Sequence, residues 1–354
     1  MPGENTRRED FVTFDNGFIS MEVLKGPEWT IYSMDKKSVL FIKMSKPLMH
    51  YSIDKYPFIY PTLFEEGIQI AEIDLKTFIK FGDEFEIDYK PPKCLYFTNT
   101  ARSASTLFGS MLHQNGHSIV IGEHPAITTL SCGFEQSYWN KNDITRLLSP
   151  TIKILRKSIP SSHLLIFKVR SCDICLVPFL AESFPEIKHI FMFRKRGLSS
   201  VERMISTEPI ILFLHQLYVN FPYFCRFLTS LISDISKEFK PKTMTEAAML
   251  VYGRPYWIYK KNENLFDFPI VWQDELISSP EKVLKPIFEK LNLPSDTCVK
   301  HALACMEHDS QDGTYLSQKI MKQYSASKIT PEIKETILSY AKRFEMELEI
   351  LGFE

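Results

Sequence analysis

The chain has 354 residues, 44% hydrophobic and 24% charged, a composition typical of a globular protein of about two domains. Its 42 Lys and Arg nearly balance 43 Asp and Glu, which leaves a net charge of -1. This balance argues against a protein that binds nucleic acid through overall positive charge, and against disorder of the whole chain. The opening residues MPGENTRRED lack the apolar run of a signal peptide, so we expect a cytoplasmic protein.

The first ninety residues are predicted to be rich in β-strands. Alternating apolar residues and turn residues suggest three hairpins, namely Phe11–Phe14 with Phe18–Val23, Thr30–Met34 with Ser38–Met44, and Thr77–Phe81 with Glu84–Asp88. Pro91-Pro92 then breaks the pattern, which predicts a β-rich domain over residues 1–90 and a second domain over residues 91–354.

From Lys93 onward, strands alternate with helices. The expected strands are Cys94–Asn99, Ser118–Ile121, Leu164–Val169, His189–Phe193 and Phe268–Trp272. The expected helices are Ser105–Gln114, Ile174–Ser183, Leu198–Ile205, Pro280–Leu291, Ser295–Glu307 and a last one that Thr330 caps and Gly352 follows. This alternation predicts an α/β fold, with a parallel sheet flanked by helices and a β-rich N-terminal extension.

The longest apolar stretch is Pro209–Ile232, and it contains His215, Asn220 and Arg226. Polar and charged groups at the centre of a bilayer cost several kcal/mol, so we expect helices here and no membrane span. Its many aromatic residues are expected either to line a pocket for a lipophilic alcohol, sterol, terpenoid or phenol, or to form ordinary core.

The most informative segment is Leu95–Phe108, LYFTNTARSASTLF, in which an apolar strand runs through a polar turn into a helix. Such a turn aims backbone N–H groups and a helix N-terminus at one point, which binds phosphate or sulfate. Arg102 adds charge, while Ser103, Ser105 and Thr106 add hydroxyl donors. The alternative is a plain turn capped by Ser105. The ATP-type pattern G-x-x-x-x-G-K-[ST] is not matched, because both glycines and the lysine are absent.

This segment resembles the 5′-phosphosulfate loop of sulfotransferases, enzymes that use the donor 3′-phosphoadenosine 5′-phosphosulfate (PAPS). The resemblance implies that Arg102 takes the basic position and that Ser105 and Thr106 take the hydroxyl positions. The usual Pro before the cation is Ala101 here, and the usual Gly is Ala104. Glycine avoids a Cβ at that point of the loop, and alanine is its least disruptive replacement.

A second resemblance follows in the same order along the chain. His189–Met204, HIFMFRKRGLSSVERM, is similar to the strand–Arg–helix–Ser unit that binds the donor's 3′-phosphate in sulfotransferases. Arg194 matches the arginine. The serine position is taken by Ser199 or Ser200, or else by Arg203, whose charge would also suit a phosphate. The alternative is an amphipathic helix with an exposed Lys-Arg pair.

A third resemblance joins two later segments. Phe268–Leu276, FPIVWQDEL, is similar to the late strand and acidic turn of the family. Residues 309–317, DSQDGTYLS, resemble a polar loop of invertebrate-type sulfotransferases that closes over the donor's adenosine and 3′-phosphate. The residues expected to donate hydrogen bonds there are Ser310, Gln311, Gly313 and Thr314. The alternative is a plain surface turn at Asp312-Gly313.

The base that deprotonates the acceptor is expected just past the second strand. Cytosolic members of the family carry a catalytic His that corresponds to Arg170, and an arginine cannot take a proton at neutral pH. Other branches use a Glu that Glu123 matches, with His124 as the alternative. The alternative for Glu123 is that its negative charge only stabilises the positive end of the dipole of the following helix. Lys168 and Arg170 are expected either to steady the sulfuryl group or to form buried ion pairs.

The resemblance over residues 93–317 implies a PAPS-dependent sulfotransferase that acts on a hydroxyl of a small, lipophilic acceptor. No metal is expected, because no His or Cys cluster has the spacing of metal ligands and family members need none. The protein could assemble as a homodimer. The rival interpretations are a sulfotransferase-like binding protein without turnover, and an ATP-using kinase with a degenerate phosphate loop.

Overall fold

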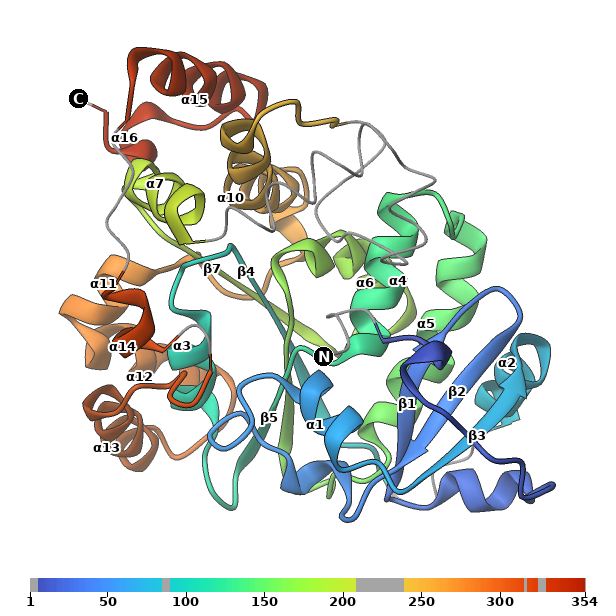
Figure 1. Ribbon diagram of the computed structural model, residues 1–354. Coiled ribbons are helices and arrows are strands. Elements are labelled where there is room, and N and C mark those ends of the chain that lie inside the picture. Colours follow the sequence, from blue (N-terminus) through green and yellow to red (C-terminus); the bar gives the residue numbers. More distant parts are fainter. Residues whose placement is uncertain (1–5, 85–89, 208–238, 315–316, 324–328, 354) are drawn as a thin grey trace.

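The computed structural model describes residues 6–84, 90–207, 239–314, 317–323 and 329–353. Within them, a three-stranded antiparallel sheet near the N-terminus packs beside a five-stranded parallel sheet that is covered by helices (Figure 1). The predicted fold class is therefore confirmed: an α/β protein with a β-rich N-terminal extension. The stretch Pro209–Ile232 lies outside the described residues.

The N-terminal extension contains both strands and helices. Its elements are η1 (Arg8–Asp10), η2 (Met21–Lys25), β1 (Trp29–Met34), β2 (Ser38–Lys43), η3 (Leu48–His50), α1 (Ile59–Glu65), β3 (Gln69–Asp74) and α2 (Leu75–Glu84). The hairpin predicted around residues 35–37 is confirmed, since β1 pairs antiparallel with β2. β2 then pairs with β3, a strand that the sequence reading did not predict.

The hairpin predicted for residues 11–23 is wrong, and so is the strand predicted for residues 77–81; residues 85–88 of its predicted partner lie outside the described residues. Residues 11–20 form no strand, and Val12, Phe14 and Phe18 are exposed at 92%, 87% and 108%, because the alternating pattern finds no sheet face to pack on. Residues 75–84 form helix α2, whose Phe78 and Phe81 lie three residues apart on its buried side. The side chain of Asp74 accepts a hydrogen bond from the Thr77 N–H (2.9 Å) at the start of this helix.

The second part of the chain alternates strands with helices as predicted. Its elements up to the first undescribed gap are β4 (Lys93–Asn99), α3 (Ser105–Leu112), β5 (Ser118–Gly122), α4 (Pro125–Glu135), α5 (Lys141–Arg156), β6 (Leu164–Lys168), η4 (Ser171–Leu176), α6 (Val177–Ser183), β7 (Lys188–Phe193) and α7 (Gly197–Thr207). After the gap come α10 (Met244–Lys261), η5 (Glu263–Leu265), β8 (Val271–Trp272), α11 (Gln273–Ser278), α12 (Pro280–Lys290), α13 (Ser295–Ala304), η6 (Cys305–Glu307), α14 (Gln318–Met321), α15 (Pro331–Arg343) and α16 (Leu348–Leu351).

The C-terminal helix starts where the sequence predicts and stops earlier. Thr330 caps α15 by accepting a hydrogen bond from the Ile333 N–H (3.3 Å), and Pro331 takes the first turn. The helix ends at Arg343, and Glu345 then adopts a left-handed conformation with a φ of 53°. The short helix α16 follows, and Gly352 ends that helix with a φ of 84°.

The parallel sheet has the strand order β5-β6-β4-β7-β8. Successive side chains point to opposite faces of a strand, so each strand contributes to two separate cores. Tyr96, Phe167 and Phe191 belong to the core that α4, α5, α6 and α10 cover. Leu95 and Phe97 belong to the opposite core, which α3, α12 and α13 cover. The sheet is therefore buried on both faces, as parallel sheets require.

The helix after β4 packs on the opposite face from the helices after its neighbours. Residues of α3 lie in one core, whereas those of α6 and α7, which follow β6 and β7, lie in the other. At such a reversal the connections diverge, and a crevice forms beyond the carboxyl end of the strand. The fold therefore points to the end of β4 as its ligand site.

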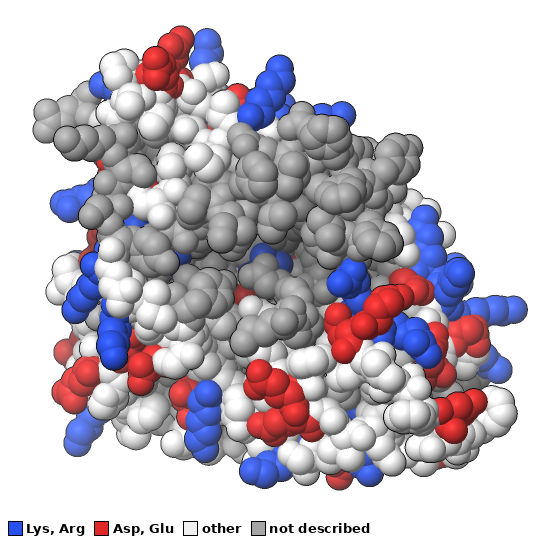
Figure 2. All heavy atoms as spheres, viewed as in Figure 1, with Lys and Arg blue, Asp and Glu red and all other residues white. Residues whose placement is uncertain are grey.

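The N-terminal extension shares a core with the parallel sheet. Side chains of β1 and β2 belong to the same hydrophobic cluster as those of α4 and α5. The boundary at residue 90 stays a prediction. On the face that Figure 2 shows, acidic and basic side chains are interspersed over the described surface. In the part of the chain that the structure describes, no helix is long and apolar enough to cross a bilayer.

The buried imidazole of His189 gives the fold a testable pH dependence. Its ring lies beside Tyr96 and Phe266, and neither ring nitrogen has a hydrogen-bond partner among the described residues. Burial lowers the pKa of His189 to about 4. As pH falls below the unfolded-state value of about 6.5, the unfolded chain takes up the proton first, so stability is lost between pH 6.5 and 4.

We expect His189→Phe to remove this loss. Wild type should lose on the order of 3 kcal/mol more than the variant between pH 7 and pH 4, measured by urea unfolding at each pH. His301→Phe is the matched control, because His301 is exposed. Parallel pH profiles for wild type and His189→Phe would contradict the expectation.

Candidate functional site

The residues expected to carry chemistry gather at the carboxyl edge of the parallel sheet. Glu123 follows β5, Lys168 ends β6, Arg102 lies in the turn after β4, and Arg194 follows β7. The strand order places them along one edge in that sequence. Segments that are nearly a hundred residues apart in the chain therefore form one site, because parallel strands end on the same side of a sheet.

The turn between β4 and α3 has an unusual backbone. Arg102 and Ala104 both adopt left-handed conformations, with φ of 62° and 60°. Ala104 is the N-cap residue of α3 and gives no side-chain hydrogen bond, so the first N–H groups of the helix have no capping side chain. Ser103 is buried, and its hydroxyl donates to the Thr100 carbonyl (2.7 Å), which holds the turn together. The turn has the form of an anion-binding site.

The predicted late loop lies against the first turn of α3. Gln311 Nε2 donates a hydrogen bond to Thr106 Oγ1 (3.3 Å), across 205 positions of sequence. Thr314 Oγ1 donates to the Gln311 carbonyl (2.8 Å), and Gly313 turns the chain with a φ of 78°. Ser310, like Gln311, is half-buried. The structure thus brings this loop to Thr106, and its closing over a donor stays a prediction.

Arg194 is tied to the turn after β4. Its Nη1 donates to the Arg102 carbonyl (3.3 Å), and its own carbonyl accepts a hydrogen bond from the Tyr252 hydroxyl (2.7 Å) of α10. Burial lowers the pKa of Arg194, and the nearby charge of Arg203 acts in the same direction. An arginine stays protonated even so. Arg194 and Arg203 are therefore neighbouring cations after β7. Gly197 makes room for the Tyr252 ring, which any Cβ at that position would meet at 2.5 Å.

Ser200 lies in α7, between Arg194 and Arg203 in the sequence. Its side chain is buried, and its hydroxyl has no hydrogen-bond partner among the described residues. Ser199 is half-buried, and its hydroxyl donates to the Arg196 carbonyl (2.9 Å) within the same turn. A buried hydroxyl without a partner is costly unless a ligand or water supplies one. Of the two serines, Ser200 is the one that remains available to a ligand.

The acidic turn of the third resemblance meets the strand that carries Arg194. Asp274 Oδ2 accepts a hydrogen bond from the Lys195 N–H (3.1 Å), and Glu275 pairs with the Lys195 ammonium (3.1 Å). Glu275 therefore holds the Lys195 ammonium, while Asp274 holds the Lys195 backbone and its charge also acts on Arg194, which donates to the turn after β4.

Glu123 and Lys168 form an ion pair at the other end of the edge. Lys168 Nζ donates to Glu123 Oε1, and the Glu123 N–H donates to the Lys168 carbonyl (2.7 Å). The side chains are 12% and 2% exposed, so the carboxylate keeps some access to solvent while the ammonium is buried. Glu123 has a φ of 52°, a conformation that costs a residue with a Cβ about 1 kcal/mol or more. Such strain is retained where a side chain must point in one direction.

His124 is placed differently from Glu123. It is the N-cap of α4, with Nδ1 accepting a hydrogen bond from the Ala126 N–H (3.3 Å) and Nε2 lying 3.2 Å from Thr30 Oγ1. Its ring is buried, and burial lowers its pKa to about 3. Both nitrogens are thus engaged in structure, and the geometry favours Glu123 over His124 as a proton acceptor.

Arg170 lies just past the end of β6 and interacts with a buried acid. Its N–H donates to Asp173 Oδ2 (3.0 Å). Burial raises the pKa of Asp173, while a hydrogen bond from Ser131 and the charge of Arg170 oppose that rise. Because Asp173 is fully buried, Arg170 balances it electrostatically. The bond comes from the Arg170 backbone, so the two roles predicted for its side chain stay predictions.

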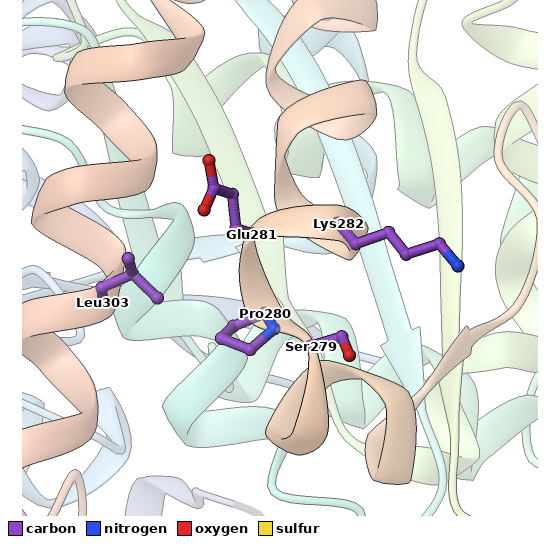
Figure 3. Close-up of a pocket in the computed structure, with 5 residues that line it drawn as sticks. All are labelled: Ser279, Pro280, Glu281, Lys282 and Leu303. Atoms are coloured by element: carbon purple, nitrogen blue, oxygen red, sulfur yellow. The ribbon is translucent and has the colours of Figure 1, made fainter.

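A separate hollow of about 490 Å³ lies between the start of α12 and the end of α13 (Figure 3). It is lined by Ser279, Pro280, Glu281, Lys282 and Leu303. None of the residues predicted for the site lines it. Among the described residues, no group of three or more His, Cys, Asp or Glu gathers in a way that could hold a metal ion.

Sequence reasoning missed two contributors to the site. Both come from segments to which no function was assigned. The Tyr252 hydroxyl donates a hydrogen bond to the Arg194 carbonyl after β7, and the Phe58 ring lies beside Lys168 at the end of β6. No local pattern marks either residue, because both reach the site through tertiary packing.

No family model and no curated protein matches the chain. Three similar solved structures are the sulfotransferase domain of the curacin biosynthetic pathway, a sulfotransferase from Mycobacterium avium and a mouse sulfotransferase in complex with PAP. Their sequence identities are 13%, 14% and 11%, and their TM-scores are 0.41, 0.39 and 0.35. The alignments cover 73%, 76% and 77% of this chain and 99%, 81% and 92% of those chains. TM-scores this low do not establish a shared fold, so the proposal below rests on this chain's own residues.

The left-handed conformation of Ala104 predicts a stabilising substitution. Ala104→Gly removes the Cβ that opposes this conformation, and we expect it to raise the free energy of unfolding by about 0.5–1 kcal/mol. Ala302→Gly, in the interior of α13, is the control and should lower it by about 1 kcal/mol. Urea unfolding of both variants measures the difference. A destabilised Ala104→Gly would show that the turn does not strain the alanine.

Proposed function

We propose that this protein is a PAPS-dependent sulfotransferase that acts on a hydroxyl of a small, lipophilic molecule. In the reaction, the acceptor oxygen forms a bond to sulfur, and the bond between sulfur and the bridging oxygen of the 5′-phosphate breaks. The acceptor proton goes to Glu123. The products are a sulfate ester and 3′-phosphoadenosine 5′-phosphate (PAP).

The observation that carries the proposal is the order of groups along the carboxyl edge of the sheet. The turn with Arg102 follows β4, the Arg194 guanidinium donates to the Arg102 carbonyl, and Ser200 in the helix after β7 has a buried hydroxyl without a partner among the described residues. These groups suit a donor with an anionic group at each of its two ends. The turn after β4 would hold one end, and the residues after β7 would hold the other. The Gln311 loop contacts Thr106 and supports the same placement.

The acceptor end is the ion pair between Glu123 and Lys168. Lys168 fixes the direction of the Glu123 carboxylate and stands, in strand order, between that carboxylate and the turn after β4. A positioned carboxylate can take a proton from an attacking hydroxyl, and fixed cations stabilise the charge that develops on the sulfuryl group and the leaving phosphate. The charges needed for transfer are thus supplied by side chains, so the proposed mechanism requires no metal.

Calorimetric titration with PAP and with ATP tests the class of donor. We expect PAP to bind and ATP to bind far more weakly, because the turn lacks the glycines and lysine of an ATP-type loop. Binding of ATP alone would favour a kinase. Binding of PAP without transfer of labelled sulfate to any of a panel of alcohols and phenols would favour the binding protein without turnover.

Arg102→Ala is expected to weaken PAP binding by about 10- to 100-fold, since a charge-assisted contact to an anionic group is lost. Arg146→Ala, on the exposed surface of α5, removes the same charge elsewhere and should leave PAP affinity unchanged. Titration calorimetry measures both. Equal affinities for the two variants would remove Arg102 from the donor site.

Glu123→Gln is expected to leave PAP binding intact and to reduce turnover by roughly 10²–10⁴-fold, because the amide cannot accept the proton. Glu135→Gln is the control, since Glu135 also forms a buried ion pair, with Arg254, and is not among the residues predicted for the site. Single-turnover transfer of labelled sulfate gives the rates. Near-normal turnover in Glu123→Gln would move the assignment to His124.

A further inference from the structure

One segment of the N-terminal extension crosses the carboxyl end of the parallel sheet. Its Ile53 N–H donates a hydrogen bond to the Val120 carbonyl (2.9 Å) of β5, the outermost strand on that side. Farther along, the segment touches Gly122, where any Cβ would lie 2.4 Å from the Pro57 carbonyl oxygen. Gly122 directly precedes Glu123. The extension therefore lies against the backbone that positions the proposed base.

The segment is firmly held in this place. Ile53 is buried in the core that α3 covers, whereas Tyr51 and Ile59 are buried in the opposite core, so the segment wraps around the edge of the sheet. The Tyr51 hydroxyl donates to Glu66 Oε2 (2.9 Å), and the Tyr56 N–H closes a turn on the Ser52 carbonyl (3.0 Å). Side chains on such a segment are preorganised rather than free to collapse onto a ligand.

Phe58 is the residue of this segment that reaches the proposed acceptor end. Its ring centroid lies 5.8 Å from the Lys168 ammonium, which is itself paired with Glu123. Phe58 is only half-buried, and the ring of Tyr60, also half-buried, lies 6.2 Å away. A partly exposed aromatic surface thus borders the ion pair on the β5 side of the edge.

Three groups of residues then lie next to one another along the strand ends. The turn with Arg102 is at β4, the Glu123–Lys168 pair is at β5 and β6, and Phe58 lies beside Lys168 on a segment that contacts Gly122. An acceptor whose hydroxyl lies at Glu123 therefore has Phe58 as a neighbour, because the ring lies beside the lysine that pairs with Glu123. Aromatic side chains in such positions favour flat apolar groups.

We propose that the N-terminal extension forms a wall of the acceptor site, and that Phe58 is a specificity-determining residue that selects hydroxyls carried on an aromatic ring. This inference rests on the proposed function, and it assigns to residues 51–60 a role in choosing the acceptor.

The test uses the full chain and 2-naphthol as the probe, titrated by calorimetry in the presence and absence of PAP. We expect wild type to bind 2-naphthol, and Phe58→Ala to weaken that binding by about 10- to 100-fold through loss of the ring contact. Phe58→Tyr keeps the ring and should restore most of the affinity. PAP affinity should be unchanged in both variants.

Phe64→Ala is the matched control, since Phe64 lies in the neighbouring helix α1, is also half-buried, and stacks on Phe11 at 5.2 Å. It should leave 2-naphthol affinity within about twofold of wild type, because a change away from the ligand has little effect on binding. With 2-naphthol as acceptor, Phe58→Ala should raise KM more than it lowers kcat.

Two failures are distinguishable. If PAP does not bind, the proposed function fails, and the titration without nucleotide still tests the ring contact at Phe58. If PAP binds but wild type does not bind 2-naphthol, or Phe58→Ala binds it as tightly as wild type does, then the assignment of Phe58 is overturned and the proposed function stands.

Discussion

The parallel pairing of β4 with both β6 and β7 is the constraint on which the rest of the site depends. It brings the ends of three strands to one edge, and the helix after β4 leaves on the opposite face from the helices after its neighbours. Arg102 and Arg194 can therefore meet, as the hydrogen bond from the Arg194 guanidinium to the Arg102 carbonyl shows. Without this pairing, the cations of the chain would be scattered along a nearly neutral sequence.

The edge of the sheet also concentrates features that oppose stability. Arg102, Ala104 and Glu123 adopt left-handed conformations, Lys168 is buried, and Ser200 keeps a buried hydroxyl without a partner among the described residues. Each is tolerated because the strands and helices around it are well packed. Strain of this kind accumulates where a protein must hold backbone groups and charges in a fixed direction for a ligand.

The N-terminal extension contributes to the architecture and, in our proposal, to specificity. It covers the outer strand β5, whose backbone would otherwise be an open sheet edge, through the hydrogen bond from Ile53 to Val120. The same crossing brings Phe58 beside Lys168. The segment that covers an exposed strand therefore also places an aromatic side chain beside the Glu123–Lys168 ion pair.

Much of this could be predicted from the sequence, because it follows from local patterns. The period of apolar residues predicted the strands and helices from Lys93 onward. The composition of residues 95–108 predicted a strand, a turn and a helix, which the structure has, while anion binding at that turn stays a prediction. The predictions failed where tertiary packing decides between alternatives. Residues 75–84 form a helix whose Phe78 and Phe81 pack into the core, whereas residues 11–20 form no strand and leave Val12, Phe14 and Phe18 exposed.

By itself, then, the sequence determined the α/β architecture and which segments carry cations, hydroxyls and a candidate base. Only the tertiary structure decided how those groups combine: that Lys168 pairs with Glu123, that Arg170 balances Asp173, that His124 caps a helix, and that Phe58 borders the site. The physical reason is range. Propensities and periodicity act over a few residues, whereas these contacts join residues tens to hundreds of positions apart and depend on how the whole sheet is assembled.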